Sequence, residues 1–308
     1  MLRSRASTLV SVRQVTQRNA GRSPAGIDGE VALTPEARAG VVVRVHQSIT
    51  SWQPRAVRRV YIPKASNRAK LRPLGIPVIM DRCHQQRVRH ALEPEWEARF
   101  EPRSYGFRPG RSCQDAIAAV YNACKGPRAR RVWALDADLA AAFDNIDHDH
   151  LLAALGSFPA RGLIRGWLKA GVFEAGKGFT PTEGGTPQGG VISPCLLNVA
   201  LHGLEEAAGV RYQDSGNRAG DPRRGSPVAV RYADLCRARH KSAYADSGIM
   251  PTGWWTCWSG RCRPVRARHN PGGSLGVTRC RGTRAGCRVP GSGRAGCHGA
   301  GRGRAPFP

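Results

Sequence analysis

The chain has 308 residues, 41% of them hydrophobic, which suffices for one large domain or two ordinary ones with an apolar core. No apolar run reaches the roughly 18 residues that span a bilayer, and the N-terminal sequence MLRSRASTLV lacks a signal-peptide core, so we expect a cytoplasmic protein with no membrane partner. Only 6 of the 48 basic residues are lysine, which indicates that a GC-rich gene contributes to the excess of arginine. The net charge of +26 therefore overstates the evidence for nucleic-acid binding.

Residues 1–50 form a first segment that is rich in Arg and Val. A cluster of Asn, Gly, Ser and Pro residues between positions 19 and 29 predicts turns, and the pattern that follows predicts a helix from Pro35 to about Thr50. We interpret this segment as an N-terminal extension.

A hairpin and two amphipathic helices are predicted between residues 51 and 130. The two strands lie on either side of a basic turn, and each helix repeats apolar residues at the spacing that buries one face. Ser112, with Asp115 three residues on, suits the cap of the second helix. The predicted strands are residues 57–62 and 71–79, and the predicted helices are residues 81–96 and 112–124.

Short apolar strands that end in carboxylates alternate with helices in the next hundred residues. The strand at 131–139 ends with Asp136 and Asp138, and the strand at 228–232 is followed by Asp234. Strand-then-helix order predicts an α/β fold. Carboxylates fixed at a sheet edge can hold a hard cation such as magnesium, although an isolated Asp at a strand end is more often a turn or cap residue. The predicted helices are residues 150–155, 161–170 and 191–208, the last with Pro194 in its first turn.

Residues 235–308 differ in kind from everything before them. They hold 14 basic and 1 acidic side chains, 14 Gly and 6 Pro, and show no helical or strand periodicity, so we expect a disordered, low-complexity tail. Its cysteines lack a paired C-x-x-C spacing, so neither a zinc site nor disulfides are predicted. They include Cys257, Cys262, Cys280, Cys287 and Cys297.

Five motifs follow one another along the chain: KLRPLGIP (70–77), SYGFRPGRS (104–112), DLAAAFDNID (138–147), GTPQGGVISP (185–194) and YAD (232–234). In these motifs and in their order, the chain resembles a group II intron-encoded reverse transcriptase/maturase. The resemblance covers roughly residues 15–234.

The resemblance implies a right-hand polymerase with fingers at residues 51–130 and a partial palm at 131–234. It further implies an RNA-directed DNA polymerase reaction, in which a primer 3′-hydroxyl attacks the α-phosphate of a dNTP with the help of two Mg²⁺ ions. The implied partners are an RNA template, a DNA primer, dNTP and group II intron RNA. No protein partner is predicted.

The family's motifs assign the metal site to Asp138 and Asp234 as catalytic ligands, with the backbone carbonyl of Leu139 as a further ligand. Asp136 lies on the same face of its strand as Asp138, so the spacing alone leaves it as a possible ligand. In the nearby turn, Asp144 and Asp147 are interpreted as helix caps. His148 and His150 are expected to be surface residues rather than ligands.

The motifs also assign nucleotide-binding residues. Lys70 and Arg72 match the positions that grip the triphosphate, and Phe143 matches the aromatic ring that excludes a ribose 2′-hydroxyl. Gln188 and Gly189 match the loop that lies along the nascent base pair.

The chain departs from the family's pattern directly after Asp234. Members carry a second Asp followed by an apolar strand, whereas here Leu235 follows, and the segment LCRARHK (235–241) has few residues suited to a strand. We infer an internal deletion followed by loss of frame near Lys241, with no counterpart of the thumb or maturase region. A missing carboxylate slows such a reaction by about 10² to 10⁴, so the sequence predicts a defective second magnesium site and an impaired polymerase.

Two other interpretations stay open. A non-catalytic RNA-binding remnant would still hold RNA phosphates through its basic surface. A pseudogene product with an unpaired palm strand would fold poorly and be proteolysed. The motifs do not separate an intron setting from a defence-system or CRISPR-associated one.

Overall fold

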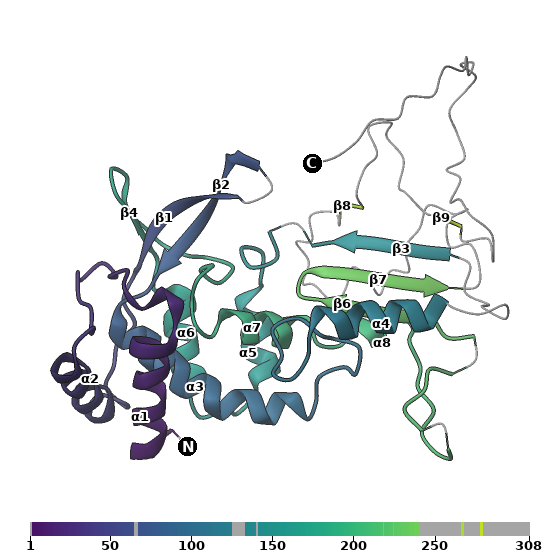
Figure 1. The fold of residues 1–308 in the computed structure, drawn as a ribbon, viewed down its shortest axis with the longest axis horizontal. Helices are drawn as coiled ribbons and strands as arrows, with labels where there is room; N and C mark the ends of the chain where they lie inside the picture. The colour runs from purple at the N-terminus through teal and green to yellow at the C-terminus, as the bar shows by residue number, and fades with distance from the viewer. Residues whose placement is uncertain are drawn as a thin grey trace, which may run out of the picture.

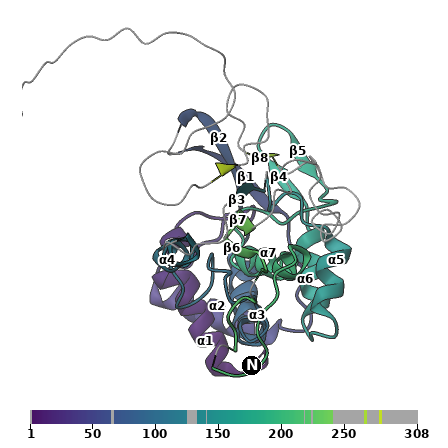
Figure 2. The ribbon, with the colours of Figure 1, turned by 90° about the vertical axis from the view of Figure 1, so that its right-hand side faces the viewer.

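The computed structural model describes residues 2–64, 67–124, 133–139, 141–217, 219–223, 225–240, 266–267 and 278–279. Over these ranges helices and two β-sheets combine, which confirms the predicted α/β class. Two views of the ribbon show the strands toward one side of the molecule and most of the helices toward the other (Figure 1, Figure 2). Most of the predicted tail lies outside the described residues.

Three helices at the N-terminal end share an apolar cluster. They are α1 (Arg5–Arg13), α2 (Pro35–Gln47) and α3 (Ile79–Glu97). The hydroxyls of Ser4 and Thr34 accept backbone N–H groups and cap α1 and α2. The predicted helix that begins at residue 35 is confirmed, and the predicted N-terminal extension packs on α3 as part of the folded body.

Buried arginines of α3 hold the segments before and within α2. Arg82 donates from Nη1 to the carbonyl of Gly21 (2.9 Å) and from Nη2 to the carbonyl of Pro24 (2.8 Å). Arg87 donates from Nη1 to the carbonyl of Val45 across 2.9 Å. Because a buried guanidinium is costly without acceptors, these bonds fix the N-terminal residues against α3. A π-helical turn (Gln14–Arg18) and a 3-10 turn (Ala20–Arg22) connect α1 to this region.

The first sheet has the strand order β2-β1-β4-β5. The strands β1 (Val57–Lys64) and β2 (Asn67–Ile76) form the predicted antiparallel hairpin. β1 also pairs in parallel with β4 (Val172–Glu174), which turns back into β5 (Gly178–Thr180). The sequence pattern does not predict β4 and β5, because strands of three residues are too short to show alternation.

The second sheet carries the acid-bearing strands and has the order β6-β7-β3-β8. β3 (Trp133–Asp138) and β6 (Val228–Tyr232) are the predicted strands. β7 (Leu235–His240) pairs with both of them, so the expectation that most of the return strand after Asp234 is missing is wrong. That expectation weighed side-chain polarity, whereas pairing uses backbone groups, which every residue of this proline-free segment supplies. Two further two-residue strands pair with β3, β8 (Arg266–Ala267) and β9 (Thr278–Arg279).

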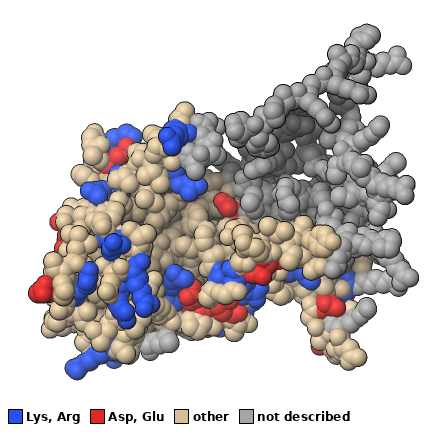
Figure 3. Space-filling view, in the orientation of Figure 1, with Lys and Arg blue, Asp and Glu red and all other residues tan. Residues whose placement is uncertain are grey.

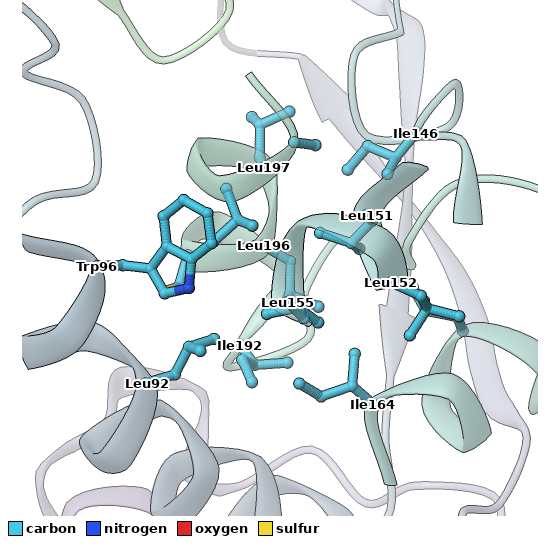
Figure 4. Close-up of a cluster of buried hydrophobic side chains, with 14 of the residues drawn as sticks. Leu92, Trp96, Ile146, Leu151, Leu152, Leu155, Ile164, Ile192, Leu196 and Leu197 are labelled. Carbon is cyan, nitrogen blue, oxygen red and sulfur yellow. The ribbon is translucent and has the colours of Figure 1, made fainter. Parts of the chain in front are cut away.

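Helices of the second half build the main core together with α3. Leu92 and Trp96 of α3 meet leucines and isoleucines from the helices that follow, and Figure 4 shows these side chains converging. Full burial of each such side chain stabilises the fold by roughly 1.5 to 3 kcal/mol. These helices are α5 (His148–Leu155), α6 (Arg161–Lys169) and α7 (Ser193–Ala200). The helix α4 (Cys113–Cys124) packs instead on β6, and the short helix α8 (Leu204–Ala207) follows α7. Of the helices the structure describes, none is long and apolar enough to cross a membrane.

Two predicted helix caps are confirmed, and one predicted helix is divided in two. Asp115 accepts from the Ser112 N–H (2.7 Å) while its own N–H donates to the Ser112 hydroxyl (3.3 Å), which is a reciprocal cap. Asp147 caps α5 by accepting the His150 N–H across 2.7 Å. The single helix predicted at 191–208 is divided, because Gly203 has a φ of +94° and separates α7 from α8.

Candidate active site

The acid-bearing end of the second sheet is built by backbone pairing. Asp138, the last residue of β3, lies opposite Leu235 in the β3–β7 register. The next residue, Leu139, donates its N–H to the carbonyl of Asp234 across 3.0 Å. Asp138, Leu139 and Asp234 are therefore brought to one end of the sheet, as the sequence analysis expects. The side chains of Asp136 and Asp138 lie outside the described part of the structure.

The donors at this edge suit a hard cation. Asp234 is half-buried, and its carboxylate, the carboxylate of Asp138 and the carbonyl of Leu139 are all oxygen donors, which Mg²⁺ prefers. Leu235 adds no donor from its side chain. Among the described residues, no group of three or more His, Cys, Asp or Glu side chains is placed to hold a metal ion.

The turn that carries Asp234 is held by buried polar contacts. Arg231 donates from Nη1 to Oδ1 of Asn198 (2.8 Å) and to the carbonyl of Ala233 (3.3 Å). The amide of Asn198 in turn donates to the carbonyl of Gly106 (2.9 Å). A Cβ on Gly106 would lie 2.1 Å from the Ala233 nitrogen, so only glycine fits there. Sequence reasoning misses Arg231, Asn198 and Gly106, because no local pattern marks contacts between such distant segments.

The residues other than glycine that have a left-handed backbone lie near this edge. Within the described residues, three residues other than glycine have positive φ: Phe107 (+60°), Ala141 (+51°) and Ala233 (+56°). Such conformations cost roughly 1 to 3 kcal/mol each and cluster at functional sites when the surroundings enforce them. Ala233 lies in the turn that carries Asp234, and Ala141 lies in the segment after Asp138. Phe107 lies in the segment that packs against the Asp234 turn.

The glycine-rich loop at residues 184–191 is anchored on the turn that follows β3. Gly185 donates its N–H to the carbonyl of Ile146 (2.8 Å), and Thr186 donates to the carbonyl of Phe143 (2.7 Å). His148, expected at the surface, is buried, and its Nε2 lies 2.6 Å from the carbonyl oxygen of Gly185. That expectation is wrong because the loop folds over the imidazole.

The same loop is also joined to the β1–β2 hairpin and to α3. Gly75 of β2 donates its N–H to the carbonyl of Gln188 (2.6 Å), and Val191 donates to Oε1 of the buried Gln85 (2.8 Å). Gly189 has a φ of +111°, and a Cβ there would lie 2.5 Å from the Gly75 carbonyl oxygen. The predicted residues Gln188 and Gly189 therefore lie between the first sheet and the segment that carries Phe143.

Asp144 belongs to this junction and does not cap α5. Its Oδ2 accepts from Nε2 of Gln188 at 3.4 Å. Loss of hydration raises the pKa of Asp144, against the lowering effect of Arg59 and of the Gln188 contact. The prediction of Asp144 as a cap is wrong, because Asp147 takes that position.

The predicted triphosphate-binding residues lie on β2. Arg72 is exposed and forms no ion pair among the described residues, so its guanidinium is available to a ligand. Lys70 lies two residues earlier on the strand and hence on the same face, with its side chain outside the described part of the structure. Gly75 connects this strand to Gln188, while no hydrogen bond or ion pair in the described ranges joins Arg72 to Asp234.

Comparison with known proteins gives matches over most of the folded region. Residues 62–236 match the family "Reverse transcriptase (RNA-dependent DNA polymerase)", and residues 1–45 match "N-terminal domain of reverse transcriptase". "Protein YkfC" of Escherichia coli (strain K12) is 37% identical over 214 residues, covering 66% of this chain and 55% of its own. "Group II intron-encoded protein LtrA" of Lactococcus lactis subsp. cremoris is 41% identical over 160 residues, covering 51% and 26%.

The chain thus spans about half the length of YkfC and about a quarter of LtrA. A solved structure titled "Partial Cas6-RT-Cas1--Cas2 complex" is similar over 79% of this chain and 38% of its own, with a TM-score of 0.43 and 20% identity.

Proposed function

The chain belongs to the reverse transcriptase (RNA-dependent DNA polymerase) family, and from this premise we propose that it extends a DNA primer on an RNA template. Its relatives include group II intron-encoded proteins, which favours an intron-associated RNA as the template. The substrate of each step is then a dNTP, and the products are a primer longer by one nucleotide and pyrophosphate.

One observation carries the proposal. The hydrogen bond from the Leu139 N–H to the Asp234 carbonyl joins the end of β3 to the turn between β6 and β7, with Asp138 opposite Leu235. Two carboxylates and one carbonyl at a sheet edge fit a magnesium site. When bound there, magnesium would polarise the α-phosphate and favour ionisation of the primer hydroxyl.

The protein's own side chains orient the nucleotide. Arg72, with Lys70 on the same face of β2, provides positive charge that suits the triphosphate, and fixed charge stabilises the negative charge that develops during transfer. Phe143, whose carbonyl accepts the Thr186 N–H of the glycine-rich loop, would exclude a 2′-hydroxyl. The backbone at Gln188 and Gly189 can approach the nascent base pair because no Cβ projects from Gly189.

We further propose that Leu235 weakens the second metal position and with it the rate. A loss of roughly 3 to 6 kcal/mol of transition-state stabilisation corresponds to about 10² to 10⁴ in rate. Primer extension by the purified chain on an RNA template with Mg²⁺ tests the function. Slow incorporation that Asp138→Asn abolishes supports it, and incorporation that is unchanged in Asp138→Asn and Asp234→Asn contradicts it.

The missing carboxylate and the basic surface favour RNA binding without catalysis as a second candidate. Lys and Arg side chains gather over the N-terminal helices and the β1–β2 hairpin on the face seen in Figure 3. RNA held through phosphates binds less tightly as salt rises. Filter binding across a salt series, together with the extension assay, separates the two functions, since binding without any incorporation supports the second.

A further inference from the structure

Two phenylalanine rings meet at the candidate nucleotide site. The ring of Phe107 lies against the ring of Phe143 in an edge-to-face arrangement, with centroids 6.1 Å apart and planes inclined by 62°. Phe143 is half-buried and packs against the main core, whereas Phe107 is 44% exposed. An exposed phenylalanine adds little to folding, so its place beside Phe143 calls for another explanation.

The backbone of Phe107 is held in a costly conformation. Its φ of +60° lies in the left-handed region, which a bulky side chain rarely adopts. Gly106, directly before it, packs against the Ala233 backbone so closely that any Cβ would overlap, and its carbonyl accepts from the Asn198 amide (2.9 Å). The strain is therefore imposed by the turn that carries Asp234.

Arg108, which follows Phe107, is held in place as Gly106 is. The buried guanidinium of Arg108 donates from Nη1 to the carbonyls of Glu101 (2.8 Å) and Ser104 (2.9 Å). It also pairs from Nη2 with the carboxylate of Glu97 at 2.7 Å. Because Gly106 and Arg108 are both fixed, the backbone sets the direction of the Phe107 side chain. Residues 106–108 therefore link the Asp234 turn to the ring of Phe143.

We propose that Phe107 is a positioning residue for sugar selection, which holds the Phe143 ring where it collides with a ribose 2′-hydroxyl. This inference rests on the proposed function, in particular on the role of Phe143. Edge-to-face pairs contribute enough that loss of the Phe107 ring lowers the preference for a deoxynucleotide over a ribonucleotide by about two- to tenfold. Backbone strain at a residue in contact with Phe143 fits such a role.

The test measures binding, so it does not depend on the rate of catalysis. The full chain is bound to an RNA template with a dideoxy-terminated DNA primer, and the dissociation constants of dGTP and GTP opposite a template C are compared. Phe107→Asn removes the ring and suits a positive φ, so we expect an unchanged or raised melting temperature together with a two- to tenfold lower selectivity. Phe107→Tyr keeps the ring and should retain the selectivity of the unaltered chain.

Two controls make the outcomes distinct. Phe179→Ala removes a more exposed ring from β5, outside the contact, and should leave selectivity unchanged. Phe143→Ala should remove most of the selectivity. If it does and Phe107→Asn keeps the full preference, the role of Phe107 is overturned alone. If Phe143→Ala also keeps the preference for dGTP over GTP, the proposed nucleotide site is contradicted, and the inference with it. The same holds if the unaltered chain binds neither nucleotide.

Discussion

The backbone N–H of Leu139 donates a hydrogen bond to the carbonyl oxygen of Asp234 across 3.0 Å. This single bond closes the end of the sheet where β3 stops and the turn between β6 and β7 begins. It fixes the register that sets Asp138 opposite Leu235, so a carboxylate introduced at position 235 would stand beside both acids.

We therefore expect Leu235→Asp to raise primer extension by about 10² to 10⁴, because it returns an oxygen donor to the proposed metal site. Single-turnover incorporation on an RNA template measures the gain. Asp149→Asn, an exposed acid in the first turn of α5, is the matched control and should change nothing. No gain in Leu235→Asp would show that the missing acid is not what limits the rate.

Gly189→Ala should disrupt the glycine-rich loop more than a glycine replacement normally does. Its Cβ would lie 2.5 Å from the Gly75 carbonyl oxygen at a φ of +111°. Gly29→Ala is the control, since its φ is +71° and nothing lies within 4 Å of the added Cβ. We expect about 1 kcal/mol of destabilisation at Gly29, and about 2 to 4 kcal/mol with weakened dNTP binding at Gly189, by urea denaturation and nucleotide titration. Equal losses at the two positions would contradict the tight contact.

Asp81 holds three segments together from within the core. Its Oδ1 accepts the indole N–H groups of Trp52 and Trp167, each at 2.7 Å, and Oδ2 accepts the Arg55 N–H at 3.0 Å. Asp81→Ala leaves three donors without their acceptor, one of them fully buried, so we expect a loss of about 3 to 5 kcal/mol in the free energy of unfolding.

Asp81→Asn is the informative companion variant. It keeps one acceptor oxygen but turns an NH₂ group toward one donor, so its loss should be smaller than that of Asp81→Ala. Urea titrations followed by tryptophan fluorescence rank the two variants, and the reverse order would argue against hydrogen bonding as the role of Asp81.

Glu205 predicts a pH dependence of stability. Burial raises the pKa of this carboxyl from its ordinary 4.5 to about 7, and the adjacent Glu101 raises it too, although hydrogen bonds from Tyr212 and the Arg103 N–H oppose the shift. A raised folded-state pKa contributes stability below about pH 4.5 that is lost as the pH rises through about 7. The loss amounts to about 3 kcal/mol.

Urea denaturation between pH 4.5 and 8 measures this slope. In Glu205→Gln the contribution of this site should vanish, since the amide does not titrate. Glu206→Gln, which alters the exposed neighbour, should keep the slope of the unaltered chain. A slope that survives in Glu205→Gln would assign the effect to another group.

Residue pattern predicts those parts of the fold that are long or strongly periodic. The hairpin of β1 and β2 and the helix α3 follow from their alternation and spacing. β7 is missed because its side chains do not resemble a buried strand, although its backbone pairs on both edges. His148 is misplaced for a related reason: the loop that covers it arrives from far along the chain.

The residues of the candidate site also fall into those that the sequence predicts and those that it does not. Its proposed metal-binding positions lie in short motifs and are predicted from them, with Asp138 and Asp234 as the clearest cases. The contacts that hold the site are not, because Asn198 reaches Gly106 and Arg231 through hydrogen bonds between segments that are distant in sequence. Local patterns record which side chains a strand or helix can bury, and they contain no information on such partners.

The two arginines of α3 decide how the N-terminal residues can be handled experimentally. Arg87 donates to the carbonyls of Val45 and Leu2, and Arg82 donates to two carbonyls that precede α2. A shortened protein that starts after residue 45 would expose an apolar surface on α3 and leave both guanidinium groups without these acceptors. Residues 2–45 therefore cover an apolar face of α3, and fragments intended for crystallisation or biochemical assays should retain them.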